Sequence, residues 1–438
     1  MDLVFWLEAI VVFLCIAVGG RLGGVGLGAA GGFGVCILAL IFGVTPGVPP
    51  IPVLLIIAAV IACTSILQGS GGLDLLVHWA ERLLRRWPQA ITITGPLVCS
   101  FFVMLVGTAY VAFAIYPVVA EVATSVKVRP ERALSAAVIS AGIGVMASPM
   151  SAAMAAMIGI MSAYDVVYWK ILAVTVPTYF IAVLASALSV YWRGPELEED
   201  PEFKRRLESG EFMWLANPRA KTFRSKPYAK RALLIFFMGI FLAIALGSTP
   251  DAHPLLDNTK SFNIPHLIQM VMLGTGFLII LLCRVPNYKF ADGSIFRAGF
   301  IGVVGVFGIA WLTGTFMHEH DQIVQPALSA LVTAHPYLFC LAAFALSSVV
   351  FSPTICTMIM IPLGLQCGLT PEFLVGTWAC CYGDFVIPGG AQIGCTAFDR
   401  TGTTRLGSLV FNHSYLRPGL VFVTTGILAG WLIAKAVF

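Results

Sequence analysis

Charged residues are scarce in this sequence. Only 11% of its 438 residues are Asp, Glu, Lys or Arg, whereas 58% are hydrophobic; a soluble domain usually carries about a quarter charged residues. No charged residue occurs between positions 322 and 371. Most of this chain therefore cannot face water, which excludes a soluble globular domain. The net charge of +4 is set by the loops and does not indicate a nucleic-acid partner.

Several other features are missing. The eleven cysteines form no metal-spaced pair, and Cys380-Cys381 is too close for an ordinary disulfide, so we interpret them as small buried hydrophobes and predict no metal site. No basic segment precedes the first apolar run, which carries Asp2 and Glu8; we expect this run to remain as a span. No nucleophile–base pair or metal set converges in the spans, so neither an enzyme nor a bound cofactor is predicted.

Long apolar runs are what the chain has instead, from residues 3–20 to residues 416–436. A bilayer core of about 30 Å needs roughly 20 apolar residues per helix, and a β-barrel would show short alternating segments. The fold class is therefore an all-α polytopic membrane protein in contact with the lipid bilayer. One long polar segment, residues 193–231, predicts a cytoplasmic linker between a first half (1–192) and a second half (232–438).

The distribution of basic residues predicts the orientation. With the N-terminus outside, and with 90–126 and 336–366 as re-entrant hairpins, 23 of the 26 Lys and Arg residues lie on the cytoplasmic side. An excess of Lys and Arg marks cytoplasmic loops. We therefore expect a multi-pass protein of the bacterial inner membrane with both termini periplasmic.

The two halves resemble each other. Each predicted hairpin has a polar tip followed nine residues later by proline, from Thr108 to Pro117 and from Pro353 to Pro362. Each is followed by an over-long apolar segment that proline interrupts, at 133–163 and 372–398. Because the charge count places the hairpins on opposite sides, the pattern indicates an inverted repeat with two re-entrant hairpins and two broken helices. Secondary transporters with such repeats bind their solute near the bilayer midplane.

These breaks supply the candidate binding groups. Ser148-Pro149 and Ser352-Pro353 each resemble a serine N-cap followed by proline at the first helical position. Helix N-termini attract anions through unpaired N–H groups and the helix dipole, and no Lys or Arg lies in the apolar stretches that carry the breaks. The expected substrate-binding residues are Gly107, Thr108, Tyr110, Ser148, Pro149, Ser151, Ser352, Pro353, Thr354, Asp384, Gly389 and Gly390. A simple kink or a tight helix contact is the alternative for each break.

Three further features of the sequence bear on function. Asp384 is the one acid well inside an apolar segment, which favours a functional role over a position in a water-filled vestibule. His318 and His320 are expected to be solvated in an extracytoplasmic loop. The glycines at 19–34 match a nucleotide-binding pattern only in spacing; no strand precedes them, so close helix packing is the better interpretation.

Several motifs resemble the anaerobic C4-dicarboxylate transporter (Dcu) family over nearly the whole chain. They are Gly71-Gly72-Leu73-Asp74, Glu81-Arg82-Leu83-Leu84-Arg85-Arg86, Arg129-Pro130-Glu131-Arg132, Ala147-Ser148-Pro149, Phe398-Asp399-Arg400-Thr401-Gly402-Thr403-Thr404-Arg405, Phe411-Asn412-His413-Ser414 and Pro418-Gly419. The resemblance implies a carrier that exchanges fumarate, malate or aspartate for succinate, by antiport or with coupled Na⁺ or H⁺. It also implies the ion-transporter superfamily, whose members tend to be homodimers with an elevator mechanism.

The chain departs from the family pattern at the candidate site. Gly107-Thr108-Ala109 stands where Gly-Thr-Gly is usual, and Phe351-Ser352-Pro353-Thr354 replaces Asn-Ser-Gln-Ala. At the second break, Ile387-Pro388-Gly389-Gly390-Ala391 replaces Leu-Pro-Thr-Tyr-Pro, and Asp384 occupies a position that is usually aromatic. Two alternatives therefore remain beside C4-dicarboxylate exchange. One is a carrier for another small carboxylate or amino acid. The other is a dicarboxylate-binding membrane sensor subunit that docks a partner, such as a sensor kinase, on its linker.

Overall fold

The computed structural model describes residues 3–22, 25–49, 51–211, 226–248, 264–285, 293–320, 334–388, 390–406 and 412–438. Within these ranges the chain is helical and contains no strand. In the described part of the chain, seven helices are long and apolar enough to cross a membrane, or eight if the bent pair formed by α3 and α4 is one span. The prediction of an all-α, multi-pass membrane protein is confirmed.

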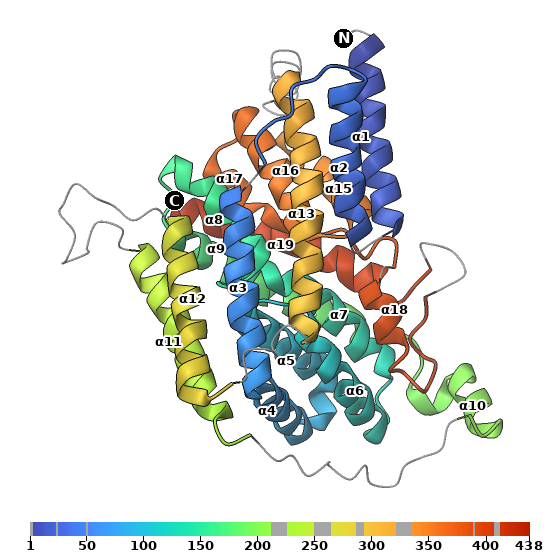
Figure 1. Ribbon diagram of the computed structural model, residues 1–438. Coiled ribbons are helices and arrows are strands. Elements are labelled where there is room, and N and C mark those ends of the chain that lie inside the picture. The colour runs from blue at the N-terminus through green and yellow to red at the C-terminus, as the bar shows by residue number, and fades with distance from the viewer. Residues whose placement is uncertain are drawn as a thin grey trace.

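The predicted first half (1–192) begins with long helices, and the predicted linker (193–231) follows it (Figure 1). Its elements are α1 (Leu3–Leu22), α2 (Val25–Leu40), α3 (Ile51–Ser70), α4 (Gly72–Arg86), α5 (Ile91–Val106), α6 (Tyr110–Ser125), α7 (Pro130–Ala147), α8 (Ala152–Met161), α9 (Tyr168–Val190) and, in the linker, α10 (Pro201–Glu208). Short 3₁₀ turns lie at Pro88–Ala90, Ser162–Tyr164 and Leu197–Glu199.

The described residues of the predicted second half (232–438) form three long helices, then shorter ones, and finally one more long helix. Its elements are α11 (Ala229–Ser248), α12 (Ile264–Cys283), α13 (Ser294–Glu319), α15 (Pro336–Val350), α16 (Pro353–Gln366), α17 (Pro371–Gly376), α18 (Gly390–Thr396) and α19 (Leu416–Val437), with a 3₁₀ turn at Trp378–Cys381. The second predicted broken helix is thus a series of short pieces between 371 and 396.

The helices are interrupted where the sequence predicts breaks. α5 ends at Val106 and α6 begins at Tyr110, while α15 ends at Val350 and α16 begins at Pro353. The segment Pro88–Val106 is 19 residues long and apolar enough to cross a membrane. Its length alone therefore does not distinguish a re-entrant arm from a full span. The other three arms are shorter apolar helices.

Close glycine contacts hold α2 against α13. A methyl group on Gly308 would lie 1.8 Å from the carbonyl oxygen of Gly28, and one on Gly31 would lie 2.2 Å from the carbonyl carbon of Gly308. No side chain larger than hydrogen fits at such distances. The glycine-rich segment therefore serves helix packing, as expected. α13 also contacts α3, and these two helices run side by side in Figure 1.

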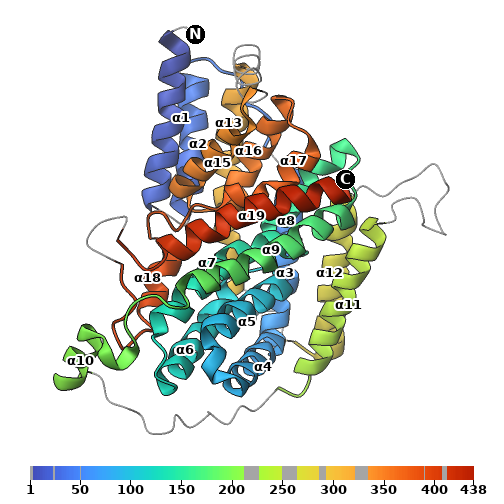
Figure 2. The same ribbon diagram turned by 180° about the vertical axis from the view of Figure 1, so that it is seen from behind.

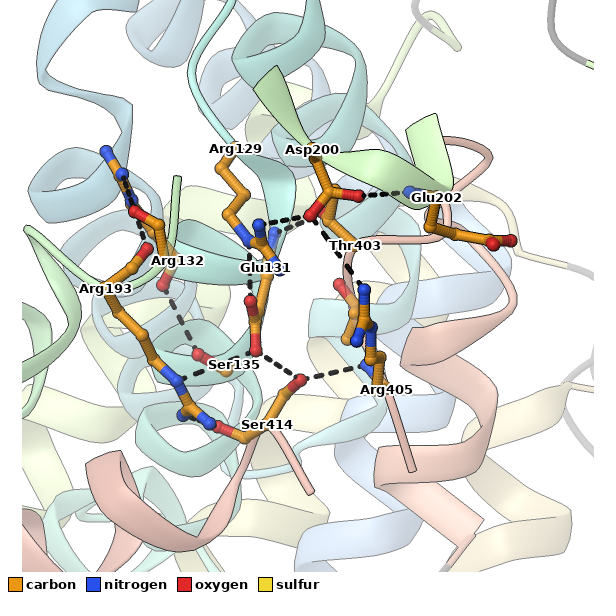
Figure 3. A network of polar contacts seen from close by, with 12 residues as sticks. Arg129, Glu131, Arg132, Ser135, Arg193, Asp200, Glu202, Thr403, Arg405 and Ser414 are labelled. Carbon is orange, nitrogen blue, oxygen red and sulfur yellow. Dashed lines mark hydrogen bonds and ion pairs between the residues drawn. The ribbon is translucent and has the colours of Figure 1, made fainter. Parts of the chain in front are cut away.

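A buried polar network joins the start of the linker to the chain on either side of it (Figure 3). Arg129 forms ion pairs with Asp200 and with Glu131, the latter at 2.7 Å. Glu131 also accepts a hydrogen bond of 2.7 Å from the hydroxyl of Ser414, which precedes α19. Arg129 and Asp200 are 5% and 1% exposed. The linker is therefore anchored at its first residues, near the α10 end of the molecule and opposite the N-terminus (Figures 1 and 2).

The expectation that His320 is solvated is wrong. Its Nε2 atom lies 2.5 Å from Oε2 of Glu8 in α1, and the two side chains are only 11% and 4% exposed. Phe5 and Phe316 pack on the imidazole ring at centroid distances of 4.9 and 4.8 Å. The end of α13 contacts α1, and this contact buries His320. The local sequence His-Glu-His gives no indication of it. His318 is exposed, as expected.

Candidate functional site

A cavity of about 860 Å³ lies where the helix interruptions meet α3 and α13. One side is formed by the α5–α6 and α15–α16 junctions together with residues 382, 384, 391 and 392 around the second break. α3 and α13 also contribute to the lining, mostly with apolar residues, among them Ile57, Val60, Ile61, Gly302 and Gly305. Segments that are more than 200 residues apart in the sequence thus share one cavity.

The structure brings half of the expected site residues to this cavity. The six that line it are Gly107, Thr108, Ser352, Pro353, Thr354 and Asp384. Gly390 begins α18, and the next two residues, Ala391 and Gln392, line the cavity. Gly389 and the side chain of Tyr110 lie outside the described part of the chain, although Tyr110 is the first residue of α6.

The remaining three, Ser148, Pro149 and Ser151, lie behind the cavity wall. Ser148 and Ser151 are buried, and neither lines the cavity, although the neighbouring Ala152 does. The expectation that Ser148 caps the new helix is wrong. Ser151 is the N-cap of α8 and accepts a hydrogen bond of 2.9 Å from the Met154 amide, whereas Ser148 accepts one of 3.2 Å from the Met150 amide. The helix therefore begins three residues later than a start at Ser148-Pro149 would place it.

The second hairpin tip has the geometry that the sequence predicts. Ser352 is the N-cap of α16, with Pro353 as the first helical residue, and its hydroxyl accepts a hydrogen bond of 3.3 Å from the Ile355 amide. Phe351 turns the chain with a φ of +54°, which is unusual for a residue other than glycine. This sharp turn lets α16 begin at the cavity.

The first hairpin tip is held by its glycine. Gly107 ends α5 with a φ of +79°, and a methyl group there would lie 2.8 Å from the carbonyl oxygen of Met150. The tip of one hairpin therefore packs directly on the backbone between α7 and α8. Two of the interruptions in the first half are in contact, which places Thr108 at the cavity.

Asp384 is the one acidic or basic side chain among the described lining residues. Its Oδ1 atom is buried and has no hydrogen-bond partner within the described residues, whereas the Tyr382 hydroxyl interacts with its carboxyl group. Tyr382 is itself buried and approaches α7 at Gly142. Sequence reasoning missed Tyr382, Gly142 and Gln392, although Tyr382 and Gln392 flank the residues that it selected around the second break.

The remaining polar lining consists of neutral groups and helix starts. Hydroxyl and amide side chains come from Thr64, Thr108, Ser352, Thr354, Tyr382 and Gln392. The N-cap of α6, the first residue of α8 and the N-cap of α16 also lie on the cavity wall. Helix N-termini carry partial positive charge and unpaired N–H groups, which favour anions. The arrangement can bind a small carboxylate without a lysine or arginine.

A polytopic helical protein with a cavity between interrupted helices has the architecture of a membrane transporter. The chain belongs to the anaerobic C4-dicarboxylate membrane transporter family (DcuA_DcuB), which it matches over residues 4–438. This is a family of membrane transporters and not of enzymes.

Named relatives are similar over almost their full lengths. The anaerobic C4-dicarboxylate transporter DcuB of Escherichia coli O6:H1 is 33% identical, with 99% of both chains covered. The C4-dicarboxylate transporter DcuA of Escherichia coli strain K12 is 35% identical and that of Wolinella succinogenes is 34% identical, with 98% of each chain covered.

Proposed function

We propose that this protein transports C4-dicarboxylates, namely fumarate, succinate, malate and aspartate, across the bacterial inner membrane by exchange. The observation that carries the proposal is the convergence of Gly107-Thr108 and Ser352–Thr354 on one cavity beside Asp384. The names of the relatives support the choice of substrate. A dicarboxylate would be held by peptide N–H groups and hydroxyls at the starts of α6, α8 and α16.

The proposed cycle is alternating access around this site. The two hairpins and the broken segments would form a moving core, and the remaining helices would form a scaffold against which the core slides. We expect a homodimer. Both termini would be periplasmic, since that orientation places 23 of the 26 basic residues on the cytoplasmic side, as is usual for membrane proteins. The apolar wall contributed by α3 and α13 supports a sliding contact, because few polar bonds would have to break there.

The test is counterflow in proteoliposomes. Purified protein is reconstituted with unlabelled succinate inside, and uptake of labelled succinate is measured with and without Na⁺ and at two pH values. The proposal predicts saturable uptake that requires succinate on the inner side. Uptake equal to that of protein-free liposomes for every C4-dicarboxylate would contradict it. The Na⁺ and pH series identifies the coupling ion.

Two other functions have specific support. A carrier for another small carboxylate or an amino acid is favoured by the altered residues at Thr108-Ala109, Ser352–Thr354 and Asp384. A dicarboxylate-binding sensor subunit, with a sensor kinase as its partner, is favoured by the anchored linker, since Arg129 and Arg132 fix residues 193–200 in one arrangement. Saturable binding of succinate without flux in the same liposomes would select the sensor.

A further inference from the structure

The charge of the cavity does not match a plain dicarboxylate. Asp384 is the one acid there and contributes one negative charge when it is ionised, and no lysine, arginine or histidine is among the described lining residues. Succinate carries two negative charges at neutral pH and would add to that charge in a space with apolar walls. Like charges in such surroundings are costly because low dielectric weakens screening. A ligand that also carries a positive group would lower this repulsion, because the positive group can lie beside Asp384.

The hydrogen-bond donors of the cavity and its one acidic acceptor come from different segments of the chain. Hydroxyls and helix N-termini from the two hairpins and α8 provide hydrogen-bond donors. Asp384 lies on the turn between Cys381 and Gly390 and provides a buried acceptor, Oδ1, that lacks a partner within the described residues. A buried carboxylate oxygen without a partner is costly. The donors suit carboxylates, and Asp384 suits a cation.

We propose that Asp384 binds the ammonium group of the substrate, so that the cavity selects amino-bearing dicarboxylates over dicarboxylates without an ammonium group. This inference rests on the proposed transport function and deepens it. An amino-dicarboxylate carries two carboxylates and one ammonium, so its carboxylates can meet the hairpin tips while the ammonium pairs with Asp384. A charge-assisted hydrogen bond of this kind is about twice as strong as a neutral one.

The position of Tyr382 supports this role. Its hydroxyl interacts with the Asp384 carboxyl group and is confined by Gly142 of α7, where a methyl group would lie 2.1 Å away. Tyr382 thereby holds the carboxylate of Asp384, while the Oδ1 atom of Asp384 remains available to a ligand. Restricted geometry of this kind favours a directional ligand contact.

The experiment uses one matched pair of ligands. Malate and aspartate are similar in size and differ in carrying a hydroxyl or an ammonium group at the same carbon. Each is added as an unlabelled competitor, and uptake of labelled succinate or labelled aspartate is measured in proteoliposomes that contain the full chain. For the wild type we expect half-inhibition by aspartate at a concentration at least tenfold lower than by malate. Equal inhibition by the two, or stronger inhibition by malate, would overturn the inference.

Substitutions then test whether Asp384 causes the preference for aspartate over malate. Asp384→Asn should weaken inhibition by aspartate at least tenfold and leave that by malate unchanged or stronger, whereas Asp384→Glu should keep the preference for aspartate. Glu208→Gln, which removes an exposed acid in α10, should behave as the wild type. An equal loss for both ligands in Asp384→Asn would overturn the inference, as would loss of Na⁺ or pH dependence with unchanged selectivity. Absence of any dicarboxylate exchange in the wild type would instead refute the transport function itself.

Discussion

A methyl group on Gly142 of α7 would lie 2.1 Å from the hydroxyl oxygen of Tyr382. Hydrogen is therefore the only side chain that leaves the tyrosine in place beside Asp384. Through this contact the middle of α7, in the first half of the chain, sets the position of a residue at the second break.

Gly142→Ala should displace Tyr382 and lower aspartate exchange. Overpacking of this kind costs about 1–3 kcal/mol, so the midpoint of thermal unfolding should fall as well. Gly274→Ala is the control, because no atom lies within 4 Å of a methyl group at that position. Unfolding scans and exchange assays of both variants make the comparison. Indistinguishable behaviour of the two would refute the importance of the contact.

Gly107→Ala should reduce exchange at least tenfold. A left-handed backbone costs alanine roughly 1–2 kcal/mol, and the added methyl would also press on the Met150 carbonyl oxygen at 2.8 Å. Gly368→Ala isolates the first cost, because Gly368 has a φ of +84° and no neighbour within 4 Å. That variant should exchange nearly as well as the wild type. A similar loss in both would show that backbone strain alone matters.

Ser352→Ala should raise the KM for exchange about fivefold. Removing an N-cap costs about 1 kcal/mol, which corresponds to roughly that factor in affinity, and the start of α16 would be held less firmly at the cavity. Ser352→Thr should restore the cap and most of the affinity. Thr370→Ala removes the cap of α17 away from the cavity and should leave the KM unchanged; a KM that rises equally there would refute a local role for Ser352.

Asp200→Asn should destabilise the protein by about 1–3 kcal/mol, the usual cost of removing one partner of a buried hydrogen bond, because Arg129 keeps its ion pair with Glu131. Asparagine keeps the side-chain oxygen that caps α10, so the change isolates the ion pair with Arg129. Glu198→Gln breaks the ion pair with Lys127. The Glu198 and Lys127 side chains are 57% and 61% exposed, so this change should lower the free energy of unfolding by at most about 1 kcal/mol. Unfolding midpoints in detergent measure both. Equal midpoints would show that the network adds no stability.

The sequence predicted the interruptions because each has a local cause. Proline at position 353 follows a residue that can cap a helix, and Gly107 permits a left-handed turn, so the chain itself carries the information. The apolar composition likewise predicted the fold class. Six of the expected site residues line the cavity for the same reason, since they lie at those interruptions.

What the sequence did not predict depends on pairing across the chain. Glu8 and His320 are 312 positions apart, and Glu131 and Ser414 are 283 apart. No local pattern says which of several acids such a histidine or serine will contact. The position of the α8 cap was also missed, because Ser148 and Ser151 are equally suitable by type and only the turn geometry distinguishes them.

The central claim is that the cavity between the two hairpin tips binds the transported carboxylate. An experimental structure of the full chain in a lipid environment with aspartate or succinate tests it most directly. We predict ligand density within hydrogen-bonding distance of Thr108 and Ser352, with the aspartate ammonium at Asp384. Density at another location, with this cavity containing only water, would contradict the account.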